Sequence, residues 1–135
     1  MYKYSIQSEI KLGCCDSRLA RIFEEVITMV DISIITSYRD LKKQKELYRE
    51  GLSKVEEGKH NVYPSLAVDA APYPIKWDSF KDIPKNRARF YFLAGIVKAI
   101  AVSHDVKIRW GGDWDGDNDF NDQTFDDLCH WEIVE

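Results

Sequence analysis

The sequence contains little cysteine, and the cysteines do not have a metal-binding spacing. Its 135 residues include only three, at Cys14, Cys15 and Cys129. An odd number argues against a disulfide framework, and adjacent cysteines rarely bridge each other. The absence of any CxxC pair excludes a structural zinc finger. We therefore expect three reduced, small and mostly buried thiols, as in a cytosolic protein.

The sequence also lacks a strongly basic segment and a long apolar run. The net charge is −4 and no block of lysine or arginine stands out, which argues against a protein that binds nucleic acid through phosphates. No stretch is long enough to span a bilayer, and residues 1–16 lack the apolar centre of a secretory signal. We expect a protein made in the cytoplasm, with no nucleic-acid partner and no membrane insertion.

The composition that is present suits one folded domain. Apolar residues make up 44% of the sequence and aromatic residues 13%, which excludes a disordered chain. Neither an internal repeat nor a low-complexity linker divides the chain. A chain of this length can bury a substantial core, so we expect a single domain over residues 1–135.

Hydrophobic periodicity predicts helices alternating with short strands. Helices are expected over residues 18–30, 40–51 and 87–105, and strands over 32–37, 66–70, 106–110 and 129–134. Asp16 or Ser17 is expected to cap the first helix, and Asp40 and Gly51 to bound the second. Loops are expected over residues 53–64, 77–86 and 111–127. This order indicates an α+β fold, with a small antiparallel sheet and helices packed on one side of it.

Two histidines and an aspartate occupy similar positions near the predicted strands. His60 precedes the segment SLAVDAAPYP, Asp69 lies inside it, and His130 opens the strand HWEIV. Each residue alone is most simply explained by ordinary hydrogen bonding. Two imidazoles and one carboxylate together form a known catalytic zinc shell, which leaves a fourth position for water or substrate.

Two further residues can complete such a site. Asp127, three residues before His130, can take a proton from an activated water and return it to a leaving amine. Arg39, next to Tyr38, can polarise a scissile carbonyl or pair with a substrate carboxylate. The simpler alternatives are a solvated aspartate in an acidic run and a surface arginine in an ordinary ion pair, and the residues alone leave both open.

The segment after the third predicted strand is strongly acidic. Four aspartates alternate along DWDGDNDFND: Asp113, Asp115, Asp117 and Asp119. The EF-hand pattern fails, because its sixth position is Asn118 rather than glycine and its twelfth is Thr124 rather than glutamate. An irregular Ca²⁺ site and a plain acidic loop remain as alternatives. The adjoining RWGGDW places two glycines between tryptophans, which indicates backbone lying close to a ligand.

Four segments in order resemble one known family. TSYRDLKKQKELYREG, KHNVYPSLAVDAAPYP, IRWGGDWDGD and DDLCHWEIV occur as in the zinc D-alanyl-D-alanine carboxypeptidase and L-alanyl-D-glutamate endopeptidase family. That family includes phage endolysins and vancomycin-resistance dipeptidases, and it shares its fold with the Hedgehog signalling domain. The likeness covers nearly the whole chain and is strongest to single-domain phage endolysins.

The resemblance implies a role for each candidate residue. It implies that His60, Asp69 and His130 bind Zn²⁺, that Asp127 is the general base where many relatives have glutamate, and that Arg39 steadies the carbonyl oxygen of the cut bond. The implied activity is hydrolysis in the stem peptide of bacterial peptidoglycan, with the L-alanyl-D-glutamate bond favoured. The alternatives are a D-alanyl-D-alanine carboxypeptidase or dipeptidase, and an inactive relative that binds cell-wall peptide or calcium. A monomer released to the cell wall through a holin is expected.

The chain departs from the family pattern at two places. Ser37 replaces the usual glycine of the GYR motif. Between His60 and Asp69 the step is nine residues rather than the usual seven and contains no glycine, while Gly58 stands where a serine is common.

Overall fold

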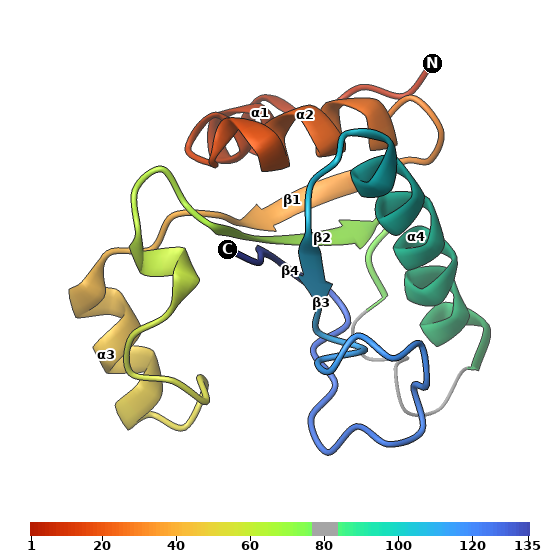
Figure 1. Cartoon of the computed structure of the whole chain (residues 1–135). Helices are drawn as coiled ribbons and strands as arrows, with labels where there is room; N and C mark the ends of the chain where they lie inside the picture. Colours follow the sequence, from red (N-terminus) through yellow and green to blue (C-terminus); the bar gives the residue numbers. More distant parts are fainter. Residues whose placement is uncertain (77–83) are drawn as a thin grey trace.

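The computed structural model describes residues 1–76 and 84–135, in which helices cover one face of a four-stranded sheet (Figure 1). The helices are α1 (Ile6–Gly13), α2 (Ser17–Val26), α3 (Leu41–Arg49) and α4 (Pro84–Ser103), with a short 3₁₀ helix, η1, at Lys59–Asn61. The strands are β1 (Ile32–Thr36), β2 (Ala67–Pro72), β3 (Ile108–Trp110) and β4 (His130–Ile133). The predicted α+β class is confirmed.

The sheet is antiparallel throughout and has the order β1-β2-β4-β3. In the central pair of strands, Asp69 of β2 lies opposite His130 of β4, and Ala67 lies opposite Glu132. Side chains alternate between the two faces of a strand. Asp69, His130 and Glu132 therefore share one face of the sheet.

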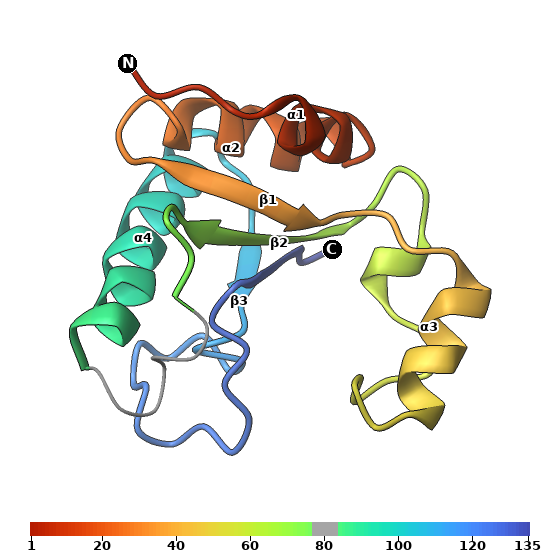
Figure 2. The ribbon, with the colours of Figure 1, turned by 180° about the vertical axis from the view of Figure 1, so that it is seen from behind.

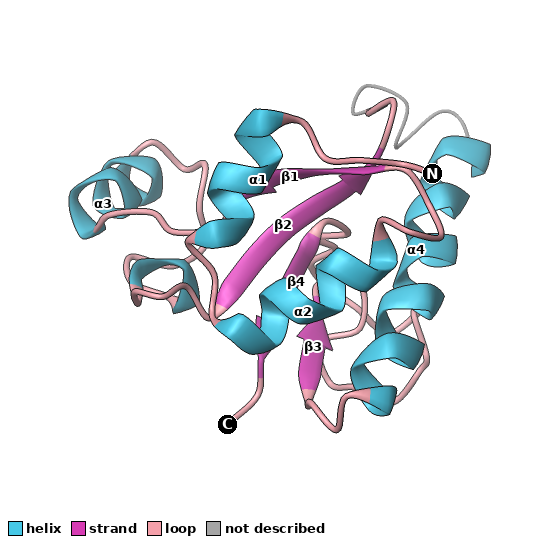
Figure 3. Ribbon diagram, turned by 90° about the horizontal axis from the view of Figure 1, so that it is seen from above, coloured by secondary structure: helices cyan, strands magenta, loops and turns pink. Residues whose placement is uncertain are grey.

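The opposite face of the sheet forms the core. Val68 of β2 and Trp131 and Ile133 of β4 pack there against α2 and α4. The helical residues in this core include Leu19, Ile22, Phe23, Val26, Phe90, Leu93 and Val97. Figure 3 shows α1 and α2 over the sheet and α4 along its side, whereas α3 stands apart, beyond the end of β1 (Figure 2). The three covering helices leave the Asp69 face free for a site.

Both predicted helix caps are present. Asp16 Oδ1 accepts a hydrogen bond of 2.9 Å from the backbone N–H of Arg18, so Asp16 rather than Ser17 caps α2. Asp40 caps α3 by accepting from the N–H of Lys43 at 2.8 Å. Gly51 follows α3 with a φ of +75°, which a residue with a side chain rarely adopts.

The sequence did not predict α1. Only Ser8 and Leu12 of this helix are buried, whereas Ile6 and Ile10 are exposed, so its apolar residues do not mark the packed face. The helix protects the edge of the sheet, because Ser8 Oγ accepts a 3.0 Å hydrogen bond from the backbone N–H of Ile34 in β1.

The start of the last helix also differs from the prediction. α4 begins at Pro84, three residues before the expected start, and proline is well suited to a first helical turn. The irregular segment predicted over residues 77–86 is therefore wrong for 84–86, and residues 77–83 lie outside the described part of the chain. None of the helices described is both long and apolar enough to cross a bilayer.

Candidate metal centre and active site

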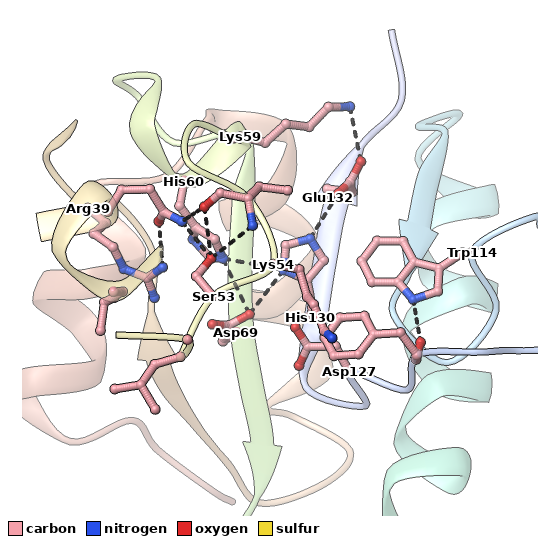
Figure 4. A pocket seen from close by; sticks show the side chains of 17 residues that line it. Arg39, Ser53, Lys54, Lys59, His60, Asp69, Trp114, Asp127, His130 and Glu132 are labelled. Carbon is pink, nitrogen blue, oxygen red and sulfur yellow. Dashed lines mark hydrogen bonds and ion pairs between the residues drawn. The ribbon is translucent and has the colours of Figure 1, made fainter. Parts of the chain in front are cut away.

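Three side chains predicted as metal ligands converge on the open face of the sheet (Figure 4). His60 comes from η1, Asp69 from β2 and His130 from the start of β4. His60 Nε2 lies 3.3 Å from His130 Nδ1 and 3.4 Å from Asp69 Oδ1. His130 Nδ1 lies 3.2 Å from the same Asp69 oxygen. The three donor atoms thus form a nearly equilateral triangle.

The outer nitrogens of the two rings indicate which tautomers are present. His60 Nδ1 lies 2.6 Å from the carbonyl oxygen of Ser37, and His130 Nε2 lies 2.9 Å from Glu132 Oε1. A carbonyl and a carboxylate only accept hydrogen bonds, so these ring nitrogens carry hydrogen. In the neutral rings, the lone pairs of His60 Nε2 and His130 Nδ1 then face the Asp69 carboxylate. Such an arrangement needs a positive charge at its centre.

The spacing of the donor triangle fits zinc. Zn²⁺ binds nitrogen and oxygen ligands at about 2.0–2.2 Å in a tetrahedron, so that neighbouring ligand atoms lie about 3.3–3.6 Å apart. The observed separations of 3.2, 3.3 and 3.4 Å agree with this spacing. Two imidazoles and one carboxylate are also a donor set that zinc prefers.

The charges around the triangle favour a cation as well. Burial opposes ionisation of Asp69, but hydrogen bonds and charge from His130 and His60 hold its pKa well below the usual range. Burial likewise works to lower the pKa of His130, but the hydrogen bonds that its ring donates to Asp69 and Glu132 outweigh burial and raise that pKa to about 9. The site therefore attracts positive charge, whether from a proton or from a metal ion.

A cavity of about 600 Å³ opens onto the donor triangle. Arg39 and Asp127 line this cavity together with the three donor residues, so the structure brings all five predicted site residues together. Residues of the segment from Gln44 to Gly58 line part of the cavity, and Trp114 and Phe125 also line it.

Arg39 is held in the cavity by neutral groups. Its Nη1 donates to Gln44 Oε1 at 2.7 Å, and Gln44 in turn donates to Ser53 Oγ and to the carbonyl of Val55, both at 2.7 Å. The backbone N–H of Arg39 donates to the carbonyl of His60 at 2.8 Å. Across residues 1–76 and 84–135 no carboxylate pairs with this guanidinium, which leaves its charge for a ligand.

Asp127 is fixed by the turn that leads into β4. Its backbone N–H donates to the carbonyl of Gly111 at 2.8 Å, and its carbonyl accepts from His130 at 3.0 Å. A Cβ at Gly111 would lie 2.1 Å from the Asp127 carbonyl oxygen, and a Cβ at Gly112 would lie 2.5 Å from the Trp110 ring. The prediction that these glycines lie close to a ligand is therefore corrected, because they make room for Asp127 and Trp110.

The surroundings of Asp127 raise the proton affinity of its carboxyl group. Burial raises its pKa, and the nearby charge of Asp69 raises it further. Cys129 Sγ lies 3.4 Å from Asp127 Oδ1, so this thiol contacts the candidate base, and among the described residues it is not part of the metal-binding group. All three cysteines are free, in agreement with the sequence.

Comparison with known proteins identifies the family of the chain. The profile of the phage L-alanyl-D-glutamate peptidase family matches residues 1–134. The chain belongs to this family. Its fold is similar to that of the Serratia marcescens L-Ala D-Glu endopeptidase ChiX, with a TM-score of 0.71 and 20% identity over 98% of this chain and 91% of that chain. A search of curated proteins found no match.

Membership confirms the expected family and the preference for L-alanyl-D-glutamate over D-alanyl-D-alanine. The peptidase thus acts on bacterial peptidoglycan. Trp114 lines its cavity, with the indole ring 5.4 Å from the His130 ring and 6.2 Å from the Phe125 ring. Trp110 and Trp131 instead stack in the core at 5.6 Å.

The acidic loop of the peptidase contains a second cluster of oxygen atoms. Asp113, Asp115 and Asp117 each place a carboxylate oxygen within 4.8 Å of the others, and Asp119 is outside this group. Asp113 is 2% exposed, and its Oδ1 is buried without a hydrogen-bond partner. Its Oδ2 accepts from the N–H of Asn118 at 2.9 Å.

Sequence reasoning missed several residues of the site of the peptidase. Glu132 lies two residues after His130 in a predicted strand, so the alternation of side chains could have placed it on the same face. Nothing in the sequence marks Gln44 as the partner of Arg39 or the Ser37 carbonyl as the partner of His60, because both contacts depend on the tertiary fold.

Proposed function

We propose that residues 1–135 form a single zinc peptidase domain that cuts the L-alanyl-D-glutamate bond in the stem peptide of peptidoglycan. His60, Asp69 and His130 would hold the metal. The observation that supports this most directly is the triangle of ring lone pairs and a carboxylate, with sides of 3.2 to 3.4 Å, at the inner end of the cavity. Membership of the phage L-alanyl-D-glutamate peptidase family supports the choice of the bond that is cut.

Zinc bound at this position would polarise the scissile carbonyl and lower the pKa of a water molecule. Asp127 takes the proton from the attacking water and transfers it to the amine that leaves with D-glutamate. Its place in the same cavity, and the raised pKa that burial and Asp69 give it, support this role. Arg39 stabilises the negative charge that develops on the carbonyl oxygen.

The cavity offers positive charge to an acidic peptide. Arg39 has no carboxylate partner among the described residues, and Lys54 also lines the cavity, with its Nζ 5.4 Å from the centre of the Phe125 ring. A glutamyl residue linked through one carboxyl group keeps its other carboxylate free, which these cations can attract. We also propose that the protein acts as a monomer at the cell wall.

Digestion of purified peptidoglycan, followed by mass spectrometry of the fragments, tests this proposal. We expect fragments that begin at D-glutamate, none after treatment with EDTA, and recovery when zinc is restored. Fragments lacking only a terminal D-alanine would overturn the assignment of the bond. Full activity in the presence of EDTA would refute the proposal that the peptidase depends on a metal ion.

We also propose that the cluster of Asp113, Asp115 and Asp117 binds Ca²⁺. The unpartnered Oδ1 of Asp113, buried beside two further carboxylates, supports this, since calcium takes oxygen ligands of this kind. With zinc restored, CaCl₂ should raise the melting temperature more than MgCl₂ does. Asp113→Asn should remove the calcium-specific shift and Asp119→Asn should retain it. No shift in the wild-type protein would refute the site.

A further inference from the structure

We infer that Glu132 is a positioning residue for the metal centre. Its carboxylate, anchored by Lys59 and Arg109, fixes the His130 ring in the tautomer that presents Nδ1 to the metal. The inference rests on the proposed function, because it takes His130 to be a metal ligand. It adds a residue that acts through a ligand and is not itself one of the three.

The register of the sheet places Glu132 behind His130. Both residues belong to β4 and are two positions apart, so they project from the same face of the strand. Glu132 is 9% exposed, and its Oε1 lies 2.9 Å from His130 Nε2. A carboxylate at this distance accepts the Nε2 hydrogen, which leaves the lone pair of Nδ1 directed toward Asp69 and His60.

The second oxygen of the same carboxylate is held by two cations. Glu132 Oε2 lies 3.3 Å from Lys59 Nζ and 3.2 Å from Arg109 Nη1 (Figure 4 shows the Lys59 contact). Lys59 directly precedes His60 in η1, and Arg109 faces Glu132 across the β3–β4 pair. One carboxylate therefore connects β3 and β4 to the segment that carries His60.

This arrangement has a consequence for metal affinity. A carboxylate that accepts the outer hydrogen of a ligating imidazole orients the ring and makes the inner nitrogen a better donor, and its removal typically costs about 10–100-fold in affinity. The outer nitrogen of His60 is bound by the backbone carbonyl of Ser37, which substitution of a side chain leaves in place. Glu132 is the partner that mutation can test.

Zinc affinity, measured on the metal-free protein by competition with a chromophoric chelator, is the decisive readout. We expect Glu132→Ala to weaken zinc binding by about 10–100-fold. Glu132→Gln should lose less zinc affinity than Glu132→Ala, because its amide oxygen still accepts the Nε2 hydrogen. The zinc affinities of Lys59→Gln and Arg109→Gln should each lie between that of Glu132→Ala and that of the wild type. Glu135→Gln is the matched control, since Glu135 contacts Arg18 on the surface and should bind zinc like the wild type.

The absorption spectrum of the Co²⁺-substituted protein provides a second readout, since it changes when the His130 ring is displaced. Zinc affinity of Glu132→Ala within twofold of the wild type would overturn the inference, even if the activity fell. If Glu132→Ala does not fold, the comparison passes to Glu132→Gln, and affinity equal to the wild type there would overturn it. A wild-type protein that binds no zinc would overturn the proposed function instead.

Discussion

His130 Nδ1 lies 3.2 Å from Asp69 Oδ1, and these two residues face each other on the central strands β4 and β2. Two of the three proposed metal ligands are therefore fixed by the register of the sheet. The third, His60, comes from η1. The backbone carbonyl of His60 accepts a 2.8 Å hydrogen bond from the backbone N–H of Arg39. Ligands mounted on a paired sheet are held with the precision that a catalytic metal centre requires.

Replacing His130 by alanine should abolish both zinc binding and activity, because the triangle loses one of its three donors. Metal analysis of the purified protein, together with release of fragments from peptidoglycan, measures both effects. His104→Ala is the matched control, since His104 lies at the end of α4, where it contacts Glu25. Stoichiometric zinc in the His130→Ala protein would contradict the ligand assignment.

Replacing Asp127 by alanine should leave zinc bound and lower turnover by about 10²–10⁴-fold, the usual contribution of a general base. Asp126→Ala provides the comparison, because the neighbouring Asp126 pairs with Arg87 and does not line the cavity. Its activity should remain close to that of the wild type. Full activity in Asp127→Ala would contradict the assignment of the base.

Replacing Gly111 by alanine should disturb the position of Asp127, because the added Cβ would lie 2.1 Å from the Asp127 carbonyl oxygen. We expect a loss of stability of about 1–3 kcal/mol, as for other overpacked sites, and a lower turnover. Chemical denaturation and the peptidoglycan assay measure the two effects. Gly95→Ala, which meets nothing within 4 Å on α4, should stabilise the protein slightly. Equal behaviour of the two variants would rule out this account of Gly111.

The cap of α2 should make stability depend on pH in the acidic range. Hydrogen bonds from the Arg18 side chain outweigh burial and lower the pKa of Asp16 in the folded protein. A lowered pKa means that the stabilisation is present above the unfolded value, about 3.9, and is lost as pH falls through the folded value. Asp16→Asn keeps a capping oxygen without the charge.

Thermal melts of the metal-free wild type and Asp16→Asn, from pH 7 down to pH 2.5, test this prediction. The wild type should melt at a higher temperature at neutral pH, and the difference should shrink below about pH 4 as the carboxylate takes up its proton. A constant difference over the whole range would show that the charge of Asp16 contributes nothing.

Local signals predicted most of the elements that carry the site. Asp69 in an apolar strand and His130 at the start of another are visible as sequence patterns, and capping residues located α2 and α3. The pairing of Asp69 with His130 joins residues 61 positions apart, so the resemblance to a family, rather than any local pattern, brought them together. Helix α1 was missed because its exposed isoleucines obscure its buried face.

The partners of the site residues could not be predicted in the same way. Gln44 is one polar residue among many on α3. Its contacts with Arg39 and with Ser53 in the following loop depend on the tertiary fold. Glu132 was within reach of the two-residue alternation of a strand. The convergence of three aspartates in the acidic loop could not be predicted by pattern matching, because they lack the spacing of an EF-hand.

The place of β4 in the sheet sets when the donor triangle can be completed during synthesis. β4 is made after the other three strands and yet pairs between β2 and β3. A ribosome that has not reached His130 therefore holds a nascent chain with two of the three proposed metal ligands and with an unpaired edge on β2. Such a chain lacks one corner of the donor triangle, so translation must pass β4 before the proposed catalytic centre can form.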